Sequence, residues 1–178
     1  MRAFVAVEVP PPANEARRGN APDHLTLLFL GEVARERVEP IAEALRPVGA
    51  IAAPFDLTLE GVGAFPSPER PRVVWTGATE GSAELVTLAN GVRAALAHEG
   101  DPTRREATFV PHLTLFLVRS PNDVRRAHEL LTSRIPPPPA RRFHVAEFML
   151  KESELSPRGA THRTVRTFPL TGRAPAPT

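Results

Sequence analysis

Two histidines in this chain, each followed two residues later by a threonine, have the types and spacing for acid–base chemistry. The tetrapeptide His-Leu-Thr-Leu occurs at His24–Leu27 and again at His112–Leu115, and each copy begins an apolar run. In a β-strand, residues i and i+2 point to the same face, so each copy would present an imidazole beside a hydroxyl and turn two leucines away. Two such strands facing one site would supply metal-free groups for proton transfer at a phosphate.

Hydrolysis of a phosphate ester needs three kinds of group. A base takes a proton from water, an acid protonates the departing oxygen, and donors stabilise charge on the non-bridging oxygens. Imidazoles with a pKa of about 6.5 can serve as either acid or base near neutral pH, and threonine hydroxyls can donate to phosphate oxygens. The two motifs therefore contain all three kinds of group.

The composition predicts one globular domain without thiol chemistry. The chain has 178 residues, of which 42% are hydrophobic, and it contains no cysteine, which excludes disulfides and thiolate metal sites. No apolar stretch approaches the roughly 18 to 20 residues of a membrane span. We therefore expect a cytoplasmic protein with no membrane association. We also expect no cofactor and no metal site, the latter because no cluster of metal ligands accompanies the two histidines. The formal net charge of +2 argues only weakly for nucleic-acid binding, but nearly all cations are arginine, which grips phosphate well.

The elements that must position the motifs are a mixture of strands and helices. Apolar alternation predicts strands over 3–9, 24–31, 55–65, 72–77, 109–118, 142–150 and 164–170. Helical spacing predicts helices over about 34–46, 85–98 and 120–133, the last with Ser120 as its cap and Pro121 in its first turn. The motifs lie almost half the chain length apart, so we interpret the chain as two halves that form a duplicated α+β lobe.

The duplicated motif resembles the two-histidine (2H) phosphoesterases, whose defining feature is His-x-[Thr/Ser]-x twice in one chain. The flanking segments look like the bacterial and archaeal RNA 2′,3′-cyclic phosphodiesterases, also called 2′-5′ RNA ligases. Segments that carry this resemblance are 2–7, 24–33, 71–75, 109–115, 152–160 and 168–170.

The resemblance implies a fold and a mechanism. The fold would be α+β, with two pseudo-symmetric lobes in one domain over residues 1–172, each an antiparallel sheet with helices outside, an active-site cleft between them and a flexible tail over 173–178. His24 would be the proton donor and His112 the proton acceptor, with Thr26 and Thr114 binding phosphate. The partner would be RNA with a 2′,3′-cyclic phosphate end, hydrolysed to a 2′-phosphate. A 5′-hydroxyl replacing water would give ATP-independent 2′-5′ ligation as a side activity.

Further residues are weaker candidates for substrate binding, namely Arg104, Phe109, Arg158 and His162. His162 stands where the family's C-terminal signature usually has tyrosine, and Leu117 where the family often has arginine, with Arg119 two residues beyond. The segment between residues 10 and 23 is shorter than the helix that family members usually carry there. His98 and His128 are expected at the surface of helices, His144 in the core or on a strand edge, and Trp75 in the core.

Two alternatives remain open, and a monomer is expected in each case because the duplication already supplies the symmetry of a dimer. One keeps the chemistry and changes the substrate to a small cyclic nucleotide. The other is a non-catalytic module in which the histidines only bind a terminal phosphate of RNA.

Overall fold

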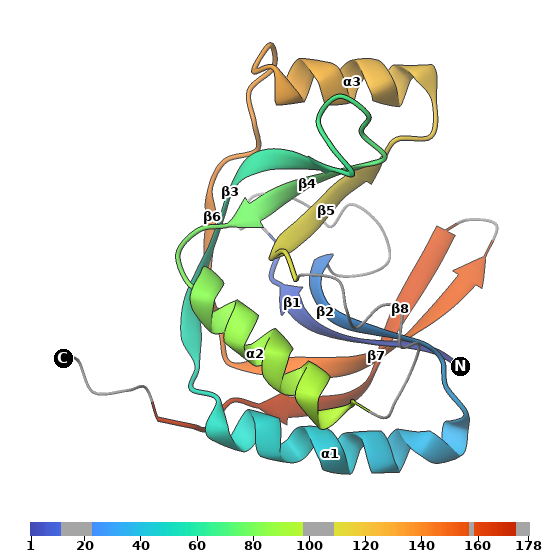
Figure 1. The fold of residues 1–178 in the computed structure, drawn as a ribbon, viewed down its shortest axis with the longest axis vertical. Helices are drawn as coiled ribbons and strands as arrows, with labels where there is room; N and C mark the ends of the chain where they lie inside the picture. The colour runs from blue at the N-terminus through green and yellow to red at the C-terminus, as the bar shows by residue number, and fades with distance from the viewer. Residues whose placement is uncertain (12–22, 98–108, 157–158, 174–178) are drawn as a thin grey trace.

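The computed structural model describes residues 1–11, 23–97, 109–156 and 159–173, and they form the predicted α+β architecture (Figure 1). In chain order the elements are β1 (Arg2–Val9), β2 (Asp23–Glu32), the 3-10 helix η1 (Arg35–Arg37), α1 (Val38–Ile51), β3 (Phe55–Phe65), β4 (Val73–Ala78), α2 (Ser82–Ala95), β5 (His112–Leu117), α3 (Pro121–Leu131), β6 (Arg141–Val145), β7 (Glu147–Ser156) and β8 (Gly159–Pro169).

The strands form two four-stranded antiparallel sheets. Sheet A has the order β2-β1-β7-β8, and sheet B has the order β5-β4-β3-β6. The two motif strands, β2 and β5, each form one edge of their sheet, and they contact each other. The two sheets therefore bring their His-Leu-Thr-Leu strands together.

The sheets do not correspond to the two halves of the sequence, which corrects the interpretation of one lobe per half. Sheet B comes from one continuous segment, whereas sheet A combines β1 and β2 with β7 and β8 from the other end of the chain. The single strand predicted over 142–150 is wrong for the same reason. The chain leaves sheet B at Val145 and enters sheet A at Glu147, and apolar alternation on both sides of Ala146 does not indicate the change of partner.

Both motif strands carry a β-bulge at the same position. In sheet A, Ala6 pairs with Thr26 but Val5 pairs with Leu28, so Leu27 is the extra residue. In sheet B, Trp75 pairs with Thr114 but Val74 pairs with Phe116, so the residue after the motif threonine is again extra. Bulges bend a strand and redirect side chains. The duplication therefore extends beyond the four motif residues to the local geometry of the strands.

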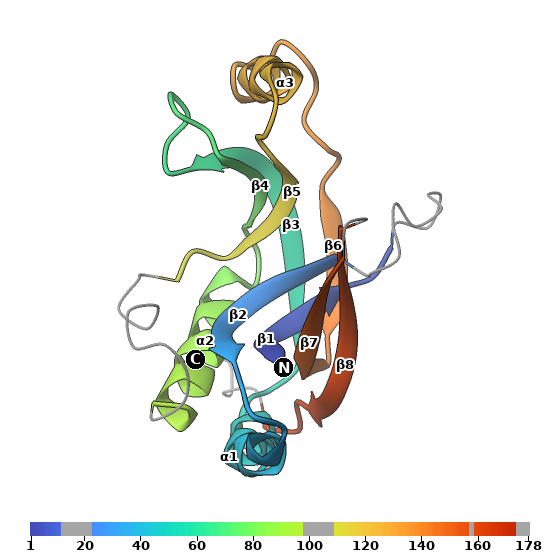
Figure 2. The same ribbon diagram turned by 90° about the vertical axis from the view of Figure 1, so that its right-hand side faces the viewer.

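The main hydrophobic core lies between the sheets and two helices. Leucines of both motifs belong to it, and Leu25, Leu27 and Leu113 are buried as the alternation predicts. Helices α1 and α2 contribute Ile41, Ala42, Leu45, Leu85, Leu88 and Val92. A smaller core under α3 contains Val74, Ala127 and Leu130. Figure 2 shows α1 and α3 at opposite ends of the molecule, with the sheets between them.

Helix boundaries differ from the sequence expectation where tertiary contacts decide them. Helix α1 continues past Pro47 to Ile51 because its last turn packs Val48 against the core. Helix α2 begins directly after Gly81, whose φ of 75° and close approach to the Asp56 carbonyl require glycine. Helix α3 has the predicted cap: the Ser120 hydroxyl accepts from the Asp123 amide, and Asp123 accepts from the Ser120 amide.

Strand β8 begins at Gly159, five residues before the predicted start at Thr164. Its first half carries polar side chains that follow no apolar alternation, because β8 is an edge strand. The missed part of the strand contains His162, one of the candidate substrate-binding residues.

Candidate active site

Sheet A turns one face to the main core and the other to the motif histidine. Phe4 and Ala6 of β1 are buried, yet they do not belong to the main core cluster, whereas their neighbours Val5 and Val7 do. The register places Ala6 opposite Thr26 and Glu8 opposite His24. Side chains of the motif therefore cover this second face, which we call the site face of sheet A.

The His24 ring belongs to a cluster of three aromatic rings on the site face. Its centroid lies 4.9 Å from that of Phe4 and 4.8 Å from that of His162, which it meets edge-on at 80°. The Phe4 and His162 centroids are 5.1 Å apart, which closes the triangle. His24 comes from β2, Phe4 from β1 and His162 from β8. Close ring packing on two sides restricts the orientation of the imidazole.

A buried charged cluster lies beside these rings. The ammonium of Lys151, the only lysine of the chain, is bonded to the Glu8 carboxylate and donates to the Thr164 hydroxyl at 3.2 Å. Lys151 is only 1% exposed and pairs with Phe4 across β1 and β7. Sequence reasoning missed this cluster, although a lone lysine within an apolar strand was a usable signal.

His162 lies in an environment that favours the neutral imidazole. Burial, and then the positive charge of Lys151, lower the pKa of His162 below the ordinary histidine value. Among the described residues, its buried Nδ1 finds no hydrogen-bond partner. His162 is thus a third imidazole beside the first motif, in direct contact with His24.

The second motif histidine is oriented by a backbone carbonyl. His112 Nδ1 lies 2.7 Å from the carbonyl oxygen of Val110, which can only accept, so the hydrogen of the neutral ring is on Nδ1 and Nε2 carries the lone pair. The ring meets Phe65 edge-on with centroids 4.9 Å apart, and the Trp75 ring lies 6.1 Å away. His112 is therefore held in one tautomer and against two aromatic rings.

Two glycines make room for Trp75 beside His112. A Cβ on Gly63 would lie 2.2 Å from the indole, and a Cβ on Gly77 would lie 3.3 Å from it. Gly63 pairs with Trp75, and Gly77 pairs with His112. The indole therefore spans β3 and β4 instead of entering the main core as predicted, and packs at 5.2 Å against Phe65. Two glycines opposite and beside a tryptophan are the sequence signal for such close packing.

Each motif threonine lies two residues after its histidine on the same strand. Thr26 is partly buried and Thr114 is exposed, and neither replaces a core residue. Their hydroxyls are on the same face as the imidazoles because i and i+2 alternate to one side of a strand. Each motif thus presents one imidazole and one hydroxyl together.

Arg141 links the two sheets next to the first motif. It begins β6 in sheet B, and its guanidinium contacts the Asp23 carboxylate at 3.3 Å and also donates to the Pro10 carbonyl. Asp23 begins β2 and immediately precedes His24. Sequence reasoning did not single out this contact, since it joins residues from distant parts of the chain.

The remaining predicted residues are placed as follows. Arg104, Arg158 and His98 lie outside the described residues. Phe109 is partly buried against the main core, with the Arg93 guanidinium 5.7 Å above its ring. Leu117 ends β5 and is 42% exposed, and Arg119 is exposed at the start of the α3 cap, where its amide donates to Asp123. His128 is exposed on α3.

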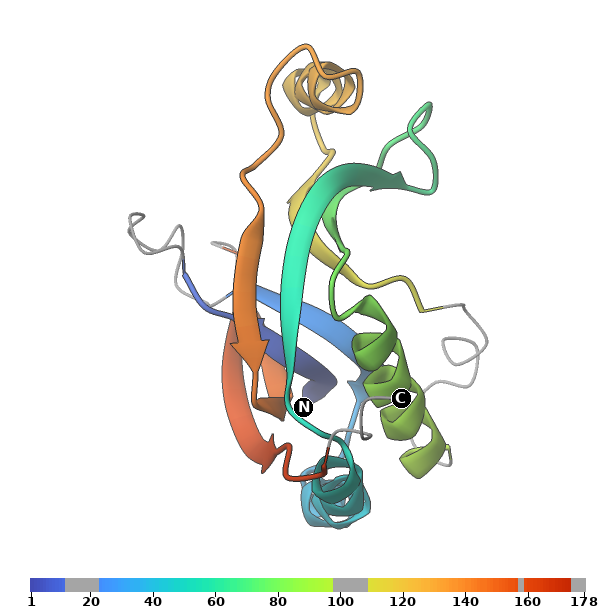
Figure 3. The same cartoon turned by 90° about the vertical axis from the view of Figure 1, so that its left-hand side faces the viewer.

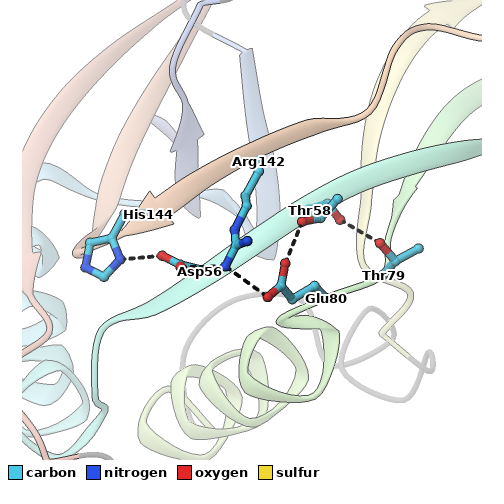
Figure 4. Close-up of polar contacts among 6 residues, drawn as sticks. All are labelled: Asp56, Thr58, Thr79, Glu80, Arg142 and His144. Atoms are coloured by element: carbon cyan, nitrogen blue, oxygen red, sulfur yellow. Dashed lines mark hydrogen bonds and ion pairs between the residues drawn. The ribbon is translucent and has the colours of Figure 1, made fainter.

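A second polar cluster lies on β3, β6 and the turn between β4 and α2 (Figure 4). His144 Nδ1 is 2.8 Å from the Asp56 carboxylate, and Arg142 contacts both Asp56 at 3.0 Å and Glu80 at 3.1 Å. Glu80 also accepts from Thr58. The hydrogen bond from His144 and then that from Arg142 lower the pKa of Asp56 below its ordinary value. His144 is exposed on β6, an edge strand that lies beside β3 (Figure 3), and the cluster links these two strands.

Across the described parts of the chain, no group of three or more His, Cys, Asp or Glu side chains is arranged to hold a metal ion. No helix of those same parts is both long and apolar enough to cross a membrane.

The fold and the paired motif strands define an α+β protein of the 2H phosphoesterase type. A family model described as the 2′-5′ RNA ligase superfamily matches residues 10–155. The chain belongs to this superfamily.

Three similar proteins illustrate the relationship. An RNA 2′,3′-cyclic phosphodiesterase of Archaeoglobus fulgidus is 40% identical over 149 residues, covering 82% of this chain and 78% of the relative. The crystal structure of TT0787 of Thermus thermophilus superimposes with a TM-score of 0.72 at 27% identity, over 98% of this chain and all of that one. E. coli LigT complexed with 3′-AMP gives a TM-score of 0.67 at 27% identity, over 96% of this chain and 98% of that one.

Proposed function

We propose that this protein is a metal-independent RNA 2′,3′-cyclic phosphodiesterase in which His24 is the proton donor and His112 the proton acceptor. The observation that carries the proposal is the contact between β2 and β5, which brings together two edge strands with the same motif and the same bulge. The names of the relatives support the substrate class, and the relative complexed with 3′-AMP supports nucleotide binding.

The environment of His112 suits a general base. Because Nδ1 donates to the Val110 carbonyl at 2.7 Å, the lone pair of the neutral ring is on Nε2. The same carbonyl stabilises the imidazolium that forms when Nε2 takes a proton. His112 would then accept a proton from water without changing its orientation.

The acid must act on the opposite side of the phosphorus from the base, which leaves that role to His24. The His24 ring lies against Phe4 and His162, with centroids 4.9 Å and 4.8 Å away, and this packing restricts the orientation from which it would donate its proton.

The reaction balances with these two residues alone. His112 removes a proton from water, the water oxygen bonds to phosphorus, and the bond between phosphorus and the ribose 3′-oxygen breaks. His24 protonates that oxygen, which leaves a 2′-phosphate and a free 3′-hydroxyl. Thr26 and Thr114 donate to the non-bridging oxygens, where negative charge increases. A 5′-hydroxyl in place of water would give a 2′-5′ linkage without ATP.

The proposal is tested with an oligonucleotide that ends in a 2′,3′-cyclic phosphate. We expect turnover to a 2′-phosphate, unchanged in a chelator, and a loss of roughly 10²- to 10⁴-fold in rate for His24→Ala or His112→Ala. The control is His128→Ala, a change at an exposed helix position. Full activity of His112→Ala would refute the mechanism, and inactivation by a chelator reversed by metal would indicate a metalloenzyme.

The same assay separates the two alternatives. Faster turnover of a cyclic mononucleotide than of the oligonucleotide would indicate a small-nucleotide phosphodiesterase. Stoichiometric binding of the oligonucleotide without any product after long incubation would indicate a binding module.

A further inference from the structure

His162 reaches His24 across the full width of sheet A. The two residues lie on β8 and β2, the opposite edges of the sheet, with β1 and β7 between them. Three interstrand steps of about 4.8 Å would place these strands roughly 14 Å apart on a flat sheet. The imidazole centroids are nevertheless only 4.8 Å apart. Sheet A must therefore curl towards its site face, with both imidazoles leaning over Phe4.

Phe4 completes the contact between the two imidazoles. Phe4 lies beneath the two imidazoles at 4.9 Å and 5.1 Å and is only 2% exposed. A substitution at His162 would therefore alter the packing of the His24 ring, both directly and through Phe4. A catalytic acid must stay within fractions of an ångström of its productive geometry, and rings packed around it provide that constraint.

Two cations, Lys151 and Arg2, lie on the same face of sheet A as His162. Lys151 of β7 is committed to Glu8 of β1 and to Thr164. Arg2 of β1 is exposed and lies further along the same face, opposite Ser153, the pairing partner of His162. A neutral ring at position 162 adds no further positive charge to this face, whereas a cation there would add one in contact with the His24 ring.

We propose that His162 is a positioning residue of the reaction, which holds the His24 ring against Phe4 in the orientation from which His24 donates its proton. This inference rests on the proposed function of His24 as the acid. His162 acts through His24 and takes no part in proton transfer itself. The residue at this position thereby influences the acid and leaves the base, His112, unaffected.

Three substitutions separate the role of the ring from the role of its charge. His162→Ala removes the ring, His162→Phe keeps a neutral ring, and His162→Lys places a cation at the site. We expect kcat to fall by roughly 10- to 100-fold in His162→Ala with KM within about twofold, because a positioning defect acts on the reacting geometry. The fall should be smaller in His162→Phe than in His162→Ala.

The deciding measurement is an NMR titration of the His24 ring without substrate, with its resonance assigned by His24→Gln. In His162→Lys the His24 midpoint should move to lower pH by roughly half a unit or more, the effect of a like charge at this separation even in water. In His162→Phe it should stay closer to the wild-type value. An equal midpoint in wild type and His162→Lys would overturn the proposal.

Activity and titration together keep the two hypotheses apart. Absence of turnover in the wild type would overturn the proposed function, and the titration would still report whether His162 controls His24. If circular dichroism shows that His162→Lys does not fold, His162→Ala decides: wild-type kcat with a wild-type pH profile would overturn the positioning role.

Discussion

Gly63→Ala adds one methyl group on β3 that collides with the tryptophan beside the second histidine. A Cβ at this position would lie 2.2 Å and 2.3 Å from two atoms of the Trp75 indole. The indole is rigid, and it also lies close to Gly77, where a Cβ would be 3.3 Å away. Gly63 does not have a positive φ, so the collision is the only cost of the substitution.

The size of the effect follows from these distances. Ordinary van der Waals contact begins near 3.4 Å, so the indole must move by about 1.2 Å to accommodate the methyl group. Overpacking of this kind costs about 1–3 kcal/mol in the free energy of unfolding. Trp75 packs on Phe65 at 5.2 Å, and Phe65 packs on the His112 ring at 4.9 Å. A displacement of about 1 Å passed to His112, the proposed base, would lower the rate by roughly 10²-fold.

The measurements are kcat/KM on the cyclic-ended oligonucleotide and the free energy of unfolding in urea. Gly61→Ala is a matched control, because Gly61 lies on the same strand with φ of 76° and a Cβ there would meet nothing within 4 Å. Gly61→Ala should lower the free energy of unfolding by about 1–2 kcal/mol, because alanine is strained at this positive φ, and it should retain activity. Wild-type kcat/KM in Gly63→Ala, or equal loss of activity in both variants, would refute the reasoning.

Two further predictions concern the polar contacts around the sheets. Asp56→Asn should lower Tm at pH 7 and lose that effect in acid, because a carboxylate with a lowered pKa stabilises the fold above its unfolded pKa of about 3.9 and stops doing so as pH falls through the folded value. A Tm difference from wild type that is constant from pH 7 to pH 2 would contradict this. Arg141→Ala should change the unfolding free energy by only about 0.2–1 kcal/mol, as expected for a partly exposed ion pair, yet lower kcat several-fold because it loosens Asp23 next to His24. Unchanged kcat in this variant would show that the contact between the sheets does not position the first motif.

The sequence predicted most elements but not their assignment to sheets. The strand over 55–65 and the Ser120 cap were predicted correctly because local alternation and capping chemistry determine them. The predicted strand over 142–150 proved to be two strands in different sheets, because both pieces have the same apolar alternation. The start of β8 was missed since polar side chains on an edge strand give no periodic signal.

The sequence likewise predicted some residues of the candidate site and missed others. The sequence by itself determined the four motif residues and their common face, since a period of two fixes which side chains share one side of a strand. The neighbours of each histidine were decided by tertiary structure alone. His162 reaches His24 across two intervening strands, and Val110 fixes the tautomer of His112 through a backbone carbonyl. Such contacts depend on the curl of a sheet and on the path of a loop, which local sequence patterns do not encode.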